Sequence, residues 1–177
     1  PRDNRSGGVA FRSVSFAYVP GTSVLTDLSF QIEPGERVAL VGSTGSGKST
    51  IISLMNRLYE TDSGVAEIDG VDVRLIATEE LRRRIVTIPQ SLFLFSGTVH
   101  DNIALFDRSV SRDQVVEAAR AVNLDGFIQS LPYGYDEEVL EEGKSLSTGQ
   151  KQLLSFARAF VRDPDVIIMD EATSSID

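Results

Sequence analysis

A glycine-rich segment in the N-terminal half constrains the fold of this 177-residue chain more than any other feature. Residues 42–49 read Gly-Ser-Thr-Gly-Ser-Gly-Lys-Ser, which fits the pattern G-x-x-x-x-G-K-[ST]. The apolar run at 37–41 predicts a strand before the segment, and residues 48–59 predict a helix after it. Strand, loop and helix in this order are the context that a phosphate-binding loop requires. A plain glycine-rich turn is the alternative, and it is disfavoured because pattern and context coincide.

The residue types in this loop suit contact with phosphate. Gly42, Gly45 and Gly47 lack a Cβ, so successive backbone N–H groups can turn inward around phosphate oxygens. The positive end of the following helix adds to the cradle. Lys48 can reach the β and γ phosphates, and the Ser49 hydroxyl can ligate Mg²⁺. The predicted nucleotide-binding residues of the loop are Gly42, Ser43, Thr44, Gly45, Ser46, Gly47, Lys48, Ser49 and Thr50.

Two acidic residues follow a short apolar run near the C-terminus. Val166–Met169 predicts a parallel strand buried on both faces, and Asp170 would lie at its carboxyl end. A carboxylate there can hold Mg²⁺ through water. Glu171 can polarise a water for attack on the γ-phosphate. The alternative, an ordinary solvated acidic pair, is less favoured beside a phosphate loop.

A third segment predicts the start of a helix. Ser147 and Gln150 form the S-x-x-Q pattern of a capping box, ahead of an apolar face that includes Leu153 and Phe156. The helix would therefore present free N–H groups and its positive end, and Gly149 would allow a ligand close to the backbone. Taken alone, such a segment is more often a plain helix cap than an anion site.

Together these segments resemble the nucleotide-binding domain of ATP-binding cassette (ABC) transporters, over essentially the whole chain. Residues 146–150 (Leu-Ser-Thr-Gly-Gln) are similar to the family's signature segment, and residues 174–177 to its D-loop. Gln90 resembles the glutamine of the glutamine loop, and the resemblance implies that it contacts Mg²⁺ and the attacking water. Tyr18 falls where the family stacks an aromatic ring on adenine. The implied catalytic residues are Glu171, Gln90 and Lys48, and the implied metal ligands are Ser49, Gln90 and Asp170.

The resemblance also implies a fold, which is of the α/β class. We expect a P-loop NTPase (RecA-like) core with a parallel sheet, an antiparallel β subdomain and a helical subdomain. Residues 1–177 would form one ABC ATPase domain: 1–75 with the antiparallel β region, the phosphate loop and its helix; 91–150 as the helical subdomain; and 151–177 returning to the core.

In the family, two such domains pack head to tail around ATP. The resemblance implies that Ser147, Gly149 and Gln150 contact the nucleotide held by a second domain, in a homodimer or a heterodimer. It also implies transmembrane domains as partners and a place at the cytoplasmic face of a membrane. The apolar run after Gln90, which includes Leu94, either receives a helix from the membrane domain or packs inside the helical subdomain.

Several local patterns predict elements around the site. Val14, Phe16 and Tyr18 alternate with polar or small neighbours, as do Leu28, Phe30 and Ile32, and both runs predict antiparallel strands. A short strand is expected within 64–70. A helical stripe is expected at Ile51, Leu54, Met55 and Leu58, and a capping box with a following stripe at Ser111, Gln114, Val115, Ala118, Ala119 and Val122.

Composition narrows the function classes. A formal net charge of −9 argues against a general nucleic-acid surface, so no nucleic-acid partner is expected. The absence of cysteine excludes disulfides and thiol catalysis. No apolar stretch approaches the roughly 18 residues needed to span a bilayer.

The sequence departs from the family pattern at several positions. Thr148 and Leu140 stand where glycine is usual. The chain ends at Asp177, before the histidine that completes the family's catalytic site, so these 177 residues alone should show little turnover. The favoured function is ATP hydrolysis that drives export. The alternatives are a non-transport cassette ATPase that acts as a switch, and an interaction module in which nucleotide only joins two domains.

Overall fold

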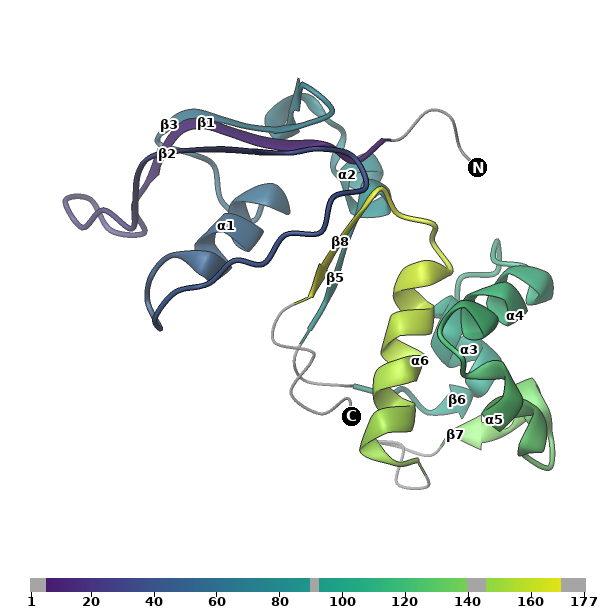
Figure 1. Cartoon of the computed structure of the whole chain (residues 1–177). Helices are drawn as coiled ribbons and strands as arrows, with labels where there is room; N and C mark the ends of the chain where they lie inside the picture. Colours follow the sequence, from purple (N-terminus) through teal and green to yellow (C-terminus); the bar gives the residue numbers. More distant parts are fainter. Residues whose placement is uncertain (1–5, 90–92, 140–145, 170–177) are drawn as a thin grey trace. The chain divides into compact units, whose positions relative to one another are not determined.

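The computed structural model of the chain describes residues 6–89, 93–139 and 146–169. The chain divides into two compact units, one up to Ile85 and one from Val86 onward, and each unit is described by itself. Figure 1 shows a sheet with its helices in the first unit and a cluster of helices in the second.

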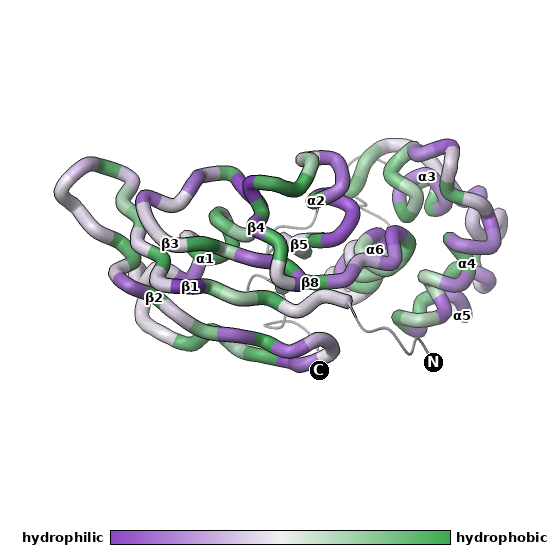
Figure 2. Tube along the Cα trace, turned by 90° about the horizontal axis from the view of Figure 1, so that it is seen from above, coloured by the Kyte–Doolittle hydropathy of each residue, from purple (hydrophilic) through white to green (hydrophobic). Residues whose placement is uncertain are grey.

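The first unit is built on a four-stranded sheet in the order β2-β1-β3-β4. β1 pairs antiparallel with both neighbours, with Phe11 opposite Phe30 on one side and opposite Ala66 on the other. Hydrophilic and hydrophobic residues alternate over most of β2, whereas β1 begins with three buried hydrophobic residues; Figure 2 shows the hydropathy along the chain. The antiparallel strands predicted from the sequence are confirmed, although β1 ends at Phe16 and does not reach Tyr18. The first unit contains β1 (Val9–Phe16), β2 (Leu25–Ile32), α1 (Lys48–Met55), β3 (Ser63–Ile68), β4 (Val71–Asp72), η1 (Val73–Leu75) and α2 (Thr78–Arg84).

The core of the first unit joins the sheet to α1. Phe11 is almost fully buried, and its ring stacks on Phe30 with centroids 4.7 Å apart. Ile51, Leu54 and Met55 of α1 are buried, as the helical stripe predicted. α1 contacts β3, so the sheet supports the helix that follows the glycine-rich loop.

Two predictions for this unit are wrong. Residues 37–41 do not form a strand, and Val41 is 92% exposed. Among the described residues this segment has no paired strand, and an isolated strand leaves its backbone groups without ladder partners. The helix ends at Met55 instead of Tyr59, because Arg57 adopts a left-handed conformation with φ of 52°, and Leu58 is therefore exposed instead of part of the stripe.

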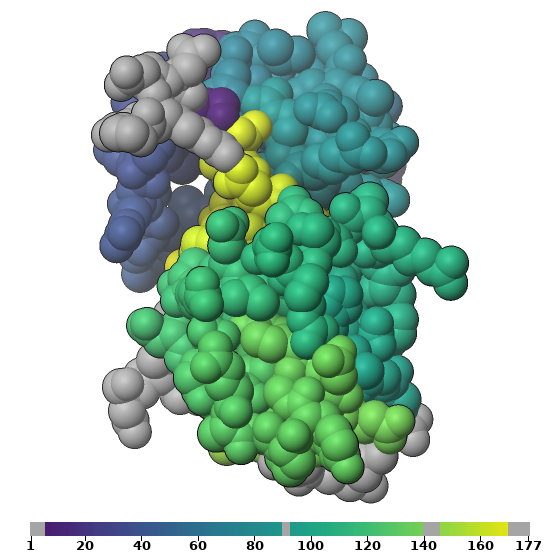
Figure 3. All heavy atoms as spheres, turned by 90° about the vertical axis from the view of Figure 1, so that its right-hand side faces the viewer, coloured from purple at the N-terminus to yellow at the C-terminus, as the bar shows by residue number. Residues whose placement is uncertain are grey.

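The second unit packs its helices around α6. α3 and α4 both contact α6, and Figure 1 shows them side by side with it. In Figure 3 the atoms of α4 and α5 form a continuous surface over this unit. Its elements are β5 (Ile85–Ile88, which begins at the boundary), β6 (Gly97–Thr98), α3 (Val99–Ala104), α4 (Arg112–Ala121), α5 (Asp125–Ser130), η2 (Gly134–Asp136), β7 (Glu138–Val139), α6 (Thr148–Phe160) and β8 (Val166–Met169). The buried core includes Leu94, Val99, Ile103, Val115, Ala119, Leu124, Ile128, Leu154 and Ala157.

Capping boxes mark where three helices of this unit begin. The predicted boxes at Ser111 and Ser147 are present, and each hydroxyl accepts a hydrogen bond from the backbone N–H three residues later. A further box, at Thr98 and Asp101, begins α3. The Thr98 hydroxyl and N–H both donate to the Asp101 carboxylate and lower its pKa. Local side-chain chemistry thus sets the start of each helix.

The strand at Val166–Met169 is confirmed, but its predicted burial on both faces is wrong. Val166, Ile167 and Ile168 are half-buried, and Met169 is 56% exposed. Among the described strands, β8 pairs only with β5, so one of its edges has no neighbour. The α/β class holds, although the described part of this core sheet is only two strands wide.

Gly64→Ala tests the connection between β1 and β3. Gly64 has φ of 75°, and an added Cβ would lie 2.3 Å from the Ser13 carbonyl oxygen. We expect a loss of about 3 kcal/mol in the free energy of unfolding, from left-handed strain and backbone overlap. Gly70→Ala is the matched control, because Gly70 has a similar φ of 74° but no atom within 4 Å of the added Cβ. Urea denaturation of both variants measures the difference, and equal losses would contradict the steric explanation.

Candidate functional site

The glycine-rich loop forms a tight turn ahead of α1. The Ser46 N–H donates to the Ser43 carbonyl at 3.2 Å, and Gly45 and Gly47 have φ of 83° and 90°. An added Cβ at Gly47 would lie 2.7 Å from Leu25 Cδ2. The loop therefore depends on glycine both for its backbone conformation and for its contact with β2.

The first turn of α1 presents hydrogen-bond donors. Gly47 is the N-cap residue and provides no side-chain cap, so the first N–H groups of the helix stay available to an anion. Ser49 in this turn is exposed. The Lys48 ammonium lies over the loop and donates to the carbonyl oxygens of Gly42, at 2.7 Å, and Ser43, at 2.9 Å. The loop thus concentrates positive charge and N–H donors in one place, which suits a polyphosphate.

Tyr18 lies beside this helix. Its hydroxyl shares a hydrogen bond of 3.1 Å with the hydroxyl of Thr50, which is buried in the first turn of α1. The ring meets Tyr59 edge-on, with centroids 5.0 Å apart at 86°, and both rings are about half exposed. The structure therefore brings Tyr18 to the phosphate loop. The contact between Tyr59 and Tyr18 was not predicted, because the sequence analysis placed Tyr59 at the end of the predicted helix.

The signature segment lies in the second unit, at the start of α6. The Ser147 Oγ accepts from the Gln150 N–H at 3.2 Å, and the Gln150 Oε1 accepts from the Ser147 N–H at 2.8 Å. Ser147, Thr148 and Gly149 are exposed, and an added Cβ at Gly149 would meet no atom within 4 Å. This unit's own packing therefore gives no reason for glycine at position 149.

Three predicted site residues lie outside the described residues. They are Gln90, Asp170 and Glu171. Their roles stay predictions from the sequence. Within the described ranges, no group of three or more His, Cys, Asp or Glu side chains forms a cluster that could hold a metal ion.

A buried polar pair in the second unit was not predicted. Asn102 is fully buried on α3, and Arg158 is half-buried on α6. The Arg158 Nε donates to the Asn102 carbonyl at 2.7 Å, and its Nη2 donates to Asn102 Oδ1 at 2.6 Å. Burial lowers the pKa of the Arg158 guanidinium from its usual value. The sequence carried no signal for this contact, because the two residues are 56 positions apart.

The apolar side chains that follow position 92 differ in burial. Leu94 is buried in the core of the second unit, whereas Phe93 and Phe95 are 59% and 42% exposed. Phe93 meets Phe95 edge-on at 4.9 Å, and Phe95 meets the exposed Phe106 at 6.0 Å. We call Phe93, Phe95 and Phe106 the aromatic patch. Packing inside the second unit is thus confirmed for Leu94, whereas a contact of the exposed rings with a membrane domain stays a prediction.

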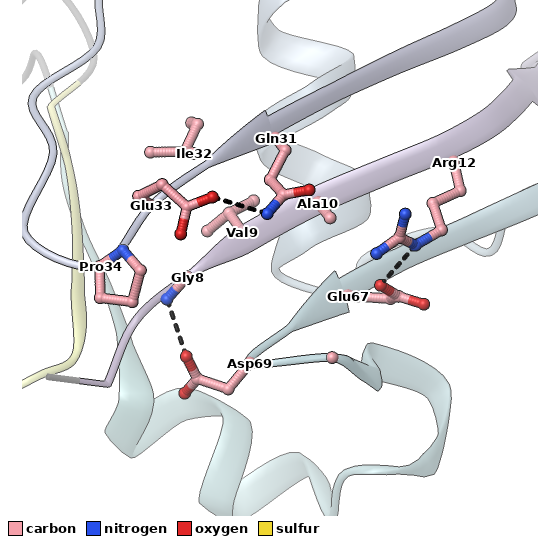
Figure 4. Close-up of a pocket in the computed structure, with 11 residues that line it drawn as sticks. Gly8, Val9, Ala10, Arg12, Gln31, Ile32, Glu33, Pro34, Glu67 and Asp69 are labelled. Atoms are coloured by element: carbon pink, nitrogen blue, oxygen red, sulfur yellow. Dashed lines mark hydrogen bonds and ion pairs between the residues drawn. The ribbon is translucent and has the colours of Figure 1, made fainter. Parts of the chain in front are cut away.

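A shallow pocket of about 280 Å³ lies on the polar face of the first unit's sheet (Figure 4). Its polar side chains are already paired: Arg12 with Glu67 at 2.8 Å, and Gln31 with Glu33 at 2.7 Å. Asp69 accepts from the Gly8 N–H at 2.8 Å. Because these groups already hydrogen-bond one another, the pocket has few polar groups left to bind a ligand.

Comparisons with known proteins agree with this geometry. The family model described as ABC transporter matches residues 25–174. The chain is 48% identical over 174 residues to a fatty acid ABC transporter ATP-binding/permease protein of Mycobacterium bovis, covering 98% of this chain and 28% of that protein. It is 43% identical over 176 residues to a probable multidrug resistance ABC transporter ATP-binding/permease protein of Bacillus subtilis, covering 99% of this chain and 26% of that protein.

A solved structure gives the same answer. The structure of a bacterial Atm1-family ABC exporter with ATP bound matches with a TM-score of 0.85 and 40% identity, covering 97% of this chain and 30% of that one. The fold and the loop define a P-loop ATP-binding domain. The chain belongs to the ABC transporter family.

The chain spans less than a third of the length of these relatives. None of the helices in the described ranges is long and apolar enough to cross a membrane.

Gly47→Ala tests the phosphate loop. The added methyl group would strain a φ of 90° and contact Leu25, so the loop should lose its shape. A strain of about 1–2 kcal/mol predicts about a tenfold weaker Kd for ATP. Gly126→Ala in α5 is the control, since its Cβ would meet nothing within 4 Å. Calorimetric titration with ATP measures both variants, and an unchanged Kd for Gly47→Ala would contradict the assignment.

Proposed function

We propose that this domain binds and hydrolyses ATP to drive export through membrane-spanning partner domains. One observation carries the proposal: Lys48 and the uncapped first turn of α1 converge on a glycine loop, in a chain of the ABC transporter family. The exporters among its relatives support transport and disfavour the non-transport switch. The intact Asp170 and Glu171 disfavour a module that only joins two domains.

Different residues of the chain act on different parts of the nucleotide. The Tyr18 ring stacks on adenine, beside a loop whose N–H groups, from Gly42 to Thr50, surround the phosphates. Lys48 neutralises charge on the β and γ phosphates. Glu171 orients and polarises the attacking water, and Gln90 assists it. Ser49, Gln90 and Asp170 would hold Mg²⁺, which supplies charge neutralisation for the departing phosphate. The exposed Ser49 in the first turn of α1 fits this role.

A second cassette domain completes the site. Ser147, Gly149 and Gln150 lie at the N-terminal end of α6, where an anion of a partner domain is favoured. The open space around Gly149 supports this role, because a neighbouring molecule can approach the helix backbone there. ATP then bridges two domains, and its hydrolysis weakens the bridge.

Transmembrane domains of the transporter are the second kind of partner. The relatives are ATP-binding/permease proteins, so an ATP-binding segment and a membrane part share one chain in them. The aromatic patch offers that part an apolar surface on the second unit. With this partner, the domain lies at the cytoplasmic face of the membrane.

Glu171→Gln in the full-length protein tests the chemistry. The amide keeps the size of the carboxylate but cannot accept a proton, so ATP should still bind while kcat falls at least about a hundredfold. Phosphate release measures turnover, and calorimetry measures binding. Glu117→Gln, an exposed change on α4, is the control and should leave both unchanged. Full turnover by Glu171→Gln would rule out Glu171 as the activating group.

Gly149→Leu tests the partner contact. The side chain has room in its own domain, and leucine favours a helix by about 1 kcal/mol over glycine, so stability should not fall. ATP-dependent dimerisation should be lost, because the side chain occupies the space needed by the partner's nucleotide. Gly126→Leu in α5 serves as control. Light scattering with and without ATP measures dimerisation, and normal ATP-dependent association would contradict the proposal.

A further inference from the structure

Arg158 joins three separate points of the second unit. Besides its two bonds to Asn102, its Nη1 donates to the Phe93 carbonyl oxygen, and its guanidinium carbon lies 5.6 Å from the centre of the Phe95 ring. All of its hydrogen-bond acceptors among the described residues are neutral oxygens, and no carboxylate there pairs with it. A half-buried cation without a counter-charge is costly, so stability alone is a weak reason for arginine at this position.

Asn102 completes the connection. Its Nδ2 donates to the carbonyl oxygens of Phe95, at 2.9 Å, and Thr98, at 3.0 Å. Its Oδ1 accepts from the Phe95 N–H at 3.0 Å as well as from Arg158. The NH₂ group and the oxygen of the Asn102 amide therefore each make two hydrogen bonds. Side chains of α3 and α6 thus hold the backbone of residues 93–98 in place.

The same helix carries this connection and the signature segment. Arg158 lies in the last turn of α6, whereas Ser147 caps its first turn, about 16 Å away at 1.5 Å per residue. A continuous helix of this length moves as a rigid body. A displacement of the aromatic patch would therefore reach the N-terminal end of α6 through the bonds of Arg158.

We propose that Arg158 is a positioning residue that couples the aromatic patch to the signature end of α6. This inference rests on the proposed function, because it assumes that the membrane part docks on the patch. The guanidinium group of Arg158 bonds the Phe93 carbonyl oxygen and both oxygens of Asn102 at once. Through these bonds, docking of the membrane part controls the rate of ATP hydrolysis.

A double-mutant cycle in the full-length protein tests the coupling. Arg158→Gln should lower kcat for ATP about tenfold and leave KM within about twofold, because the phosphate loop is untouched. Phe93→Ala keeps the carbonyl that Arg158 contacts and removes an exposed ring, so it should also lower kcat. In the Arg158→Gln background, Phe93→Ala should have no further effect, since the patch is then already uncoupled.

Controls separate coupling from loss of structure. Arg112→Gln removes another arginine of this unit, one that pairs with Asp136 at 2.8 Å, and should leave both kcat and the Phe93→Ala effect intact. If Arg158→Gln lowers the unfolding temperature, the cycle is repeated with Arg158→Lys, which keeps the charge but lacks the fork. A smaller loss of kcat with the same non-additivity is then expected.

The outcomes distinguish the inference from the proposed function. Equal effects of Phe93→Ala with and without Arg158 would overturn the coupling and leave ATP-driven export standing. A rise in KM that matches the fall in kcat would also overturn it, because Arg158 would then act on nucleotide binding. Absence of ATP hydrolysis by the unaltered full-length protein would overturn the proposed function, and this inference with it.

Discussion

The charge of a triphosphate sets the main physical requirement on this chain. Several negative charges within a few ångströms cannot leave water unless donors replace the lost hydration. The first unit meets part of that need with backbone N–H groups at α1 and with the Lys48 ammonium, both available without any change of fold. The sheet packs against α1 and holds these donors in place. A second protein surface is expected to supply the remaining donors.

The second unit meets a different requirement. Its segment 93–98 exposes aromatic rings to solvent, and side chains satisfy backbone polar groups of the same segment. Leu94 anchors the segment in the core, and Asn102 and Arg158 bond the backbone on either side of it. Side-chain amide and guanidinium groups thus replace the ladder hydrogen bonds that a regular strand would have provided. This explains how an irregular segment can be both well positioned and apolar on its exposed side.

The sequence predicted structures that depend on neighbouring residues, but it did not predict pairing between distant segments. The capping boxes at Ser111 and Ser147 and the turn around Gly47 depend on residues within three or four positions, so their patterns predicted them. The strand expected at 37–41 depends on neighbours far along the chain, and periodicity carries no information about whether they are present. Similarly, Arg158 meets Asn102 across 56 positions, a contact that only folding reveals. Gln90, Asp170 and Glu171 rest on the sequence alone.

The contact between Tyr18 and Thr50 bears on which nucleoside triphosphates the domain accepts. The Tyr18 hydroxyl already bonds Thr50, so the residue offers a base its ring face and little hydrogen-bonding capacity. Every base has a π-face, and stacking on an aromatic ring is tolerant of base identity. If Tyr18 stacks on the base as proposed, its ring would accept adenine and guanine alike, and selection between them would fall to other contacts.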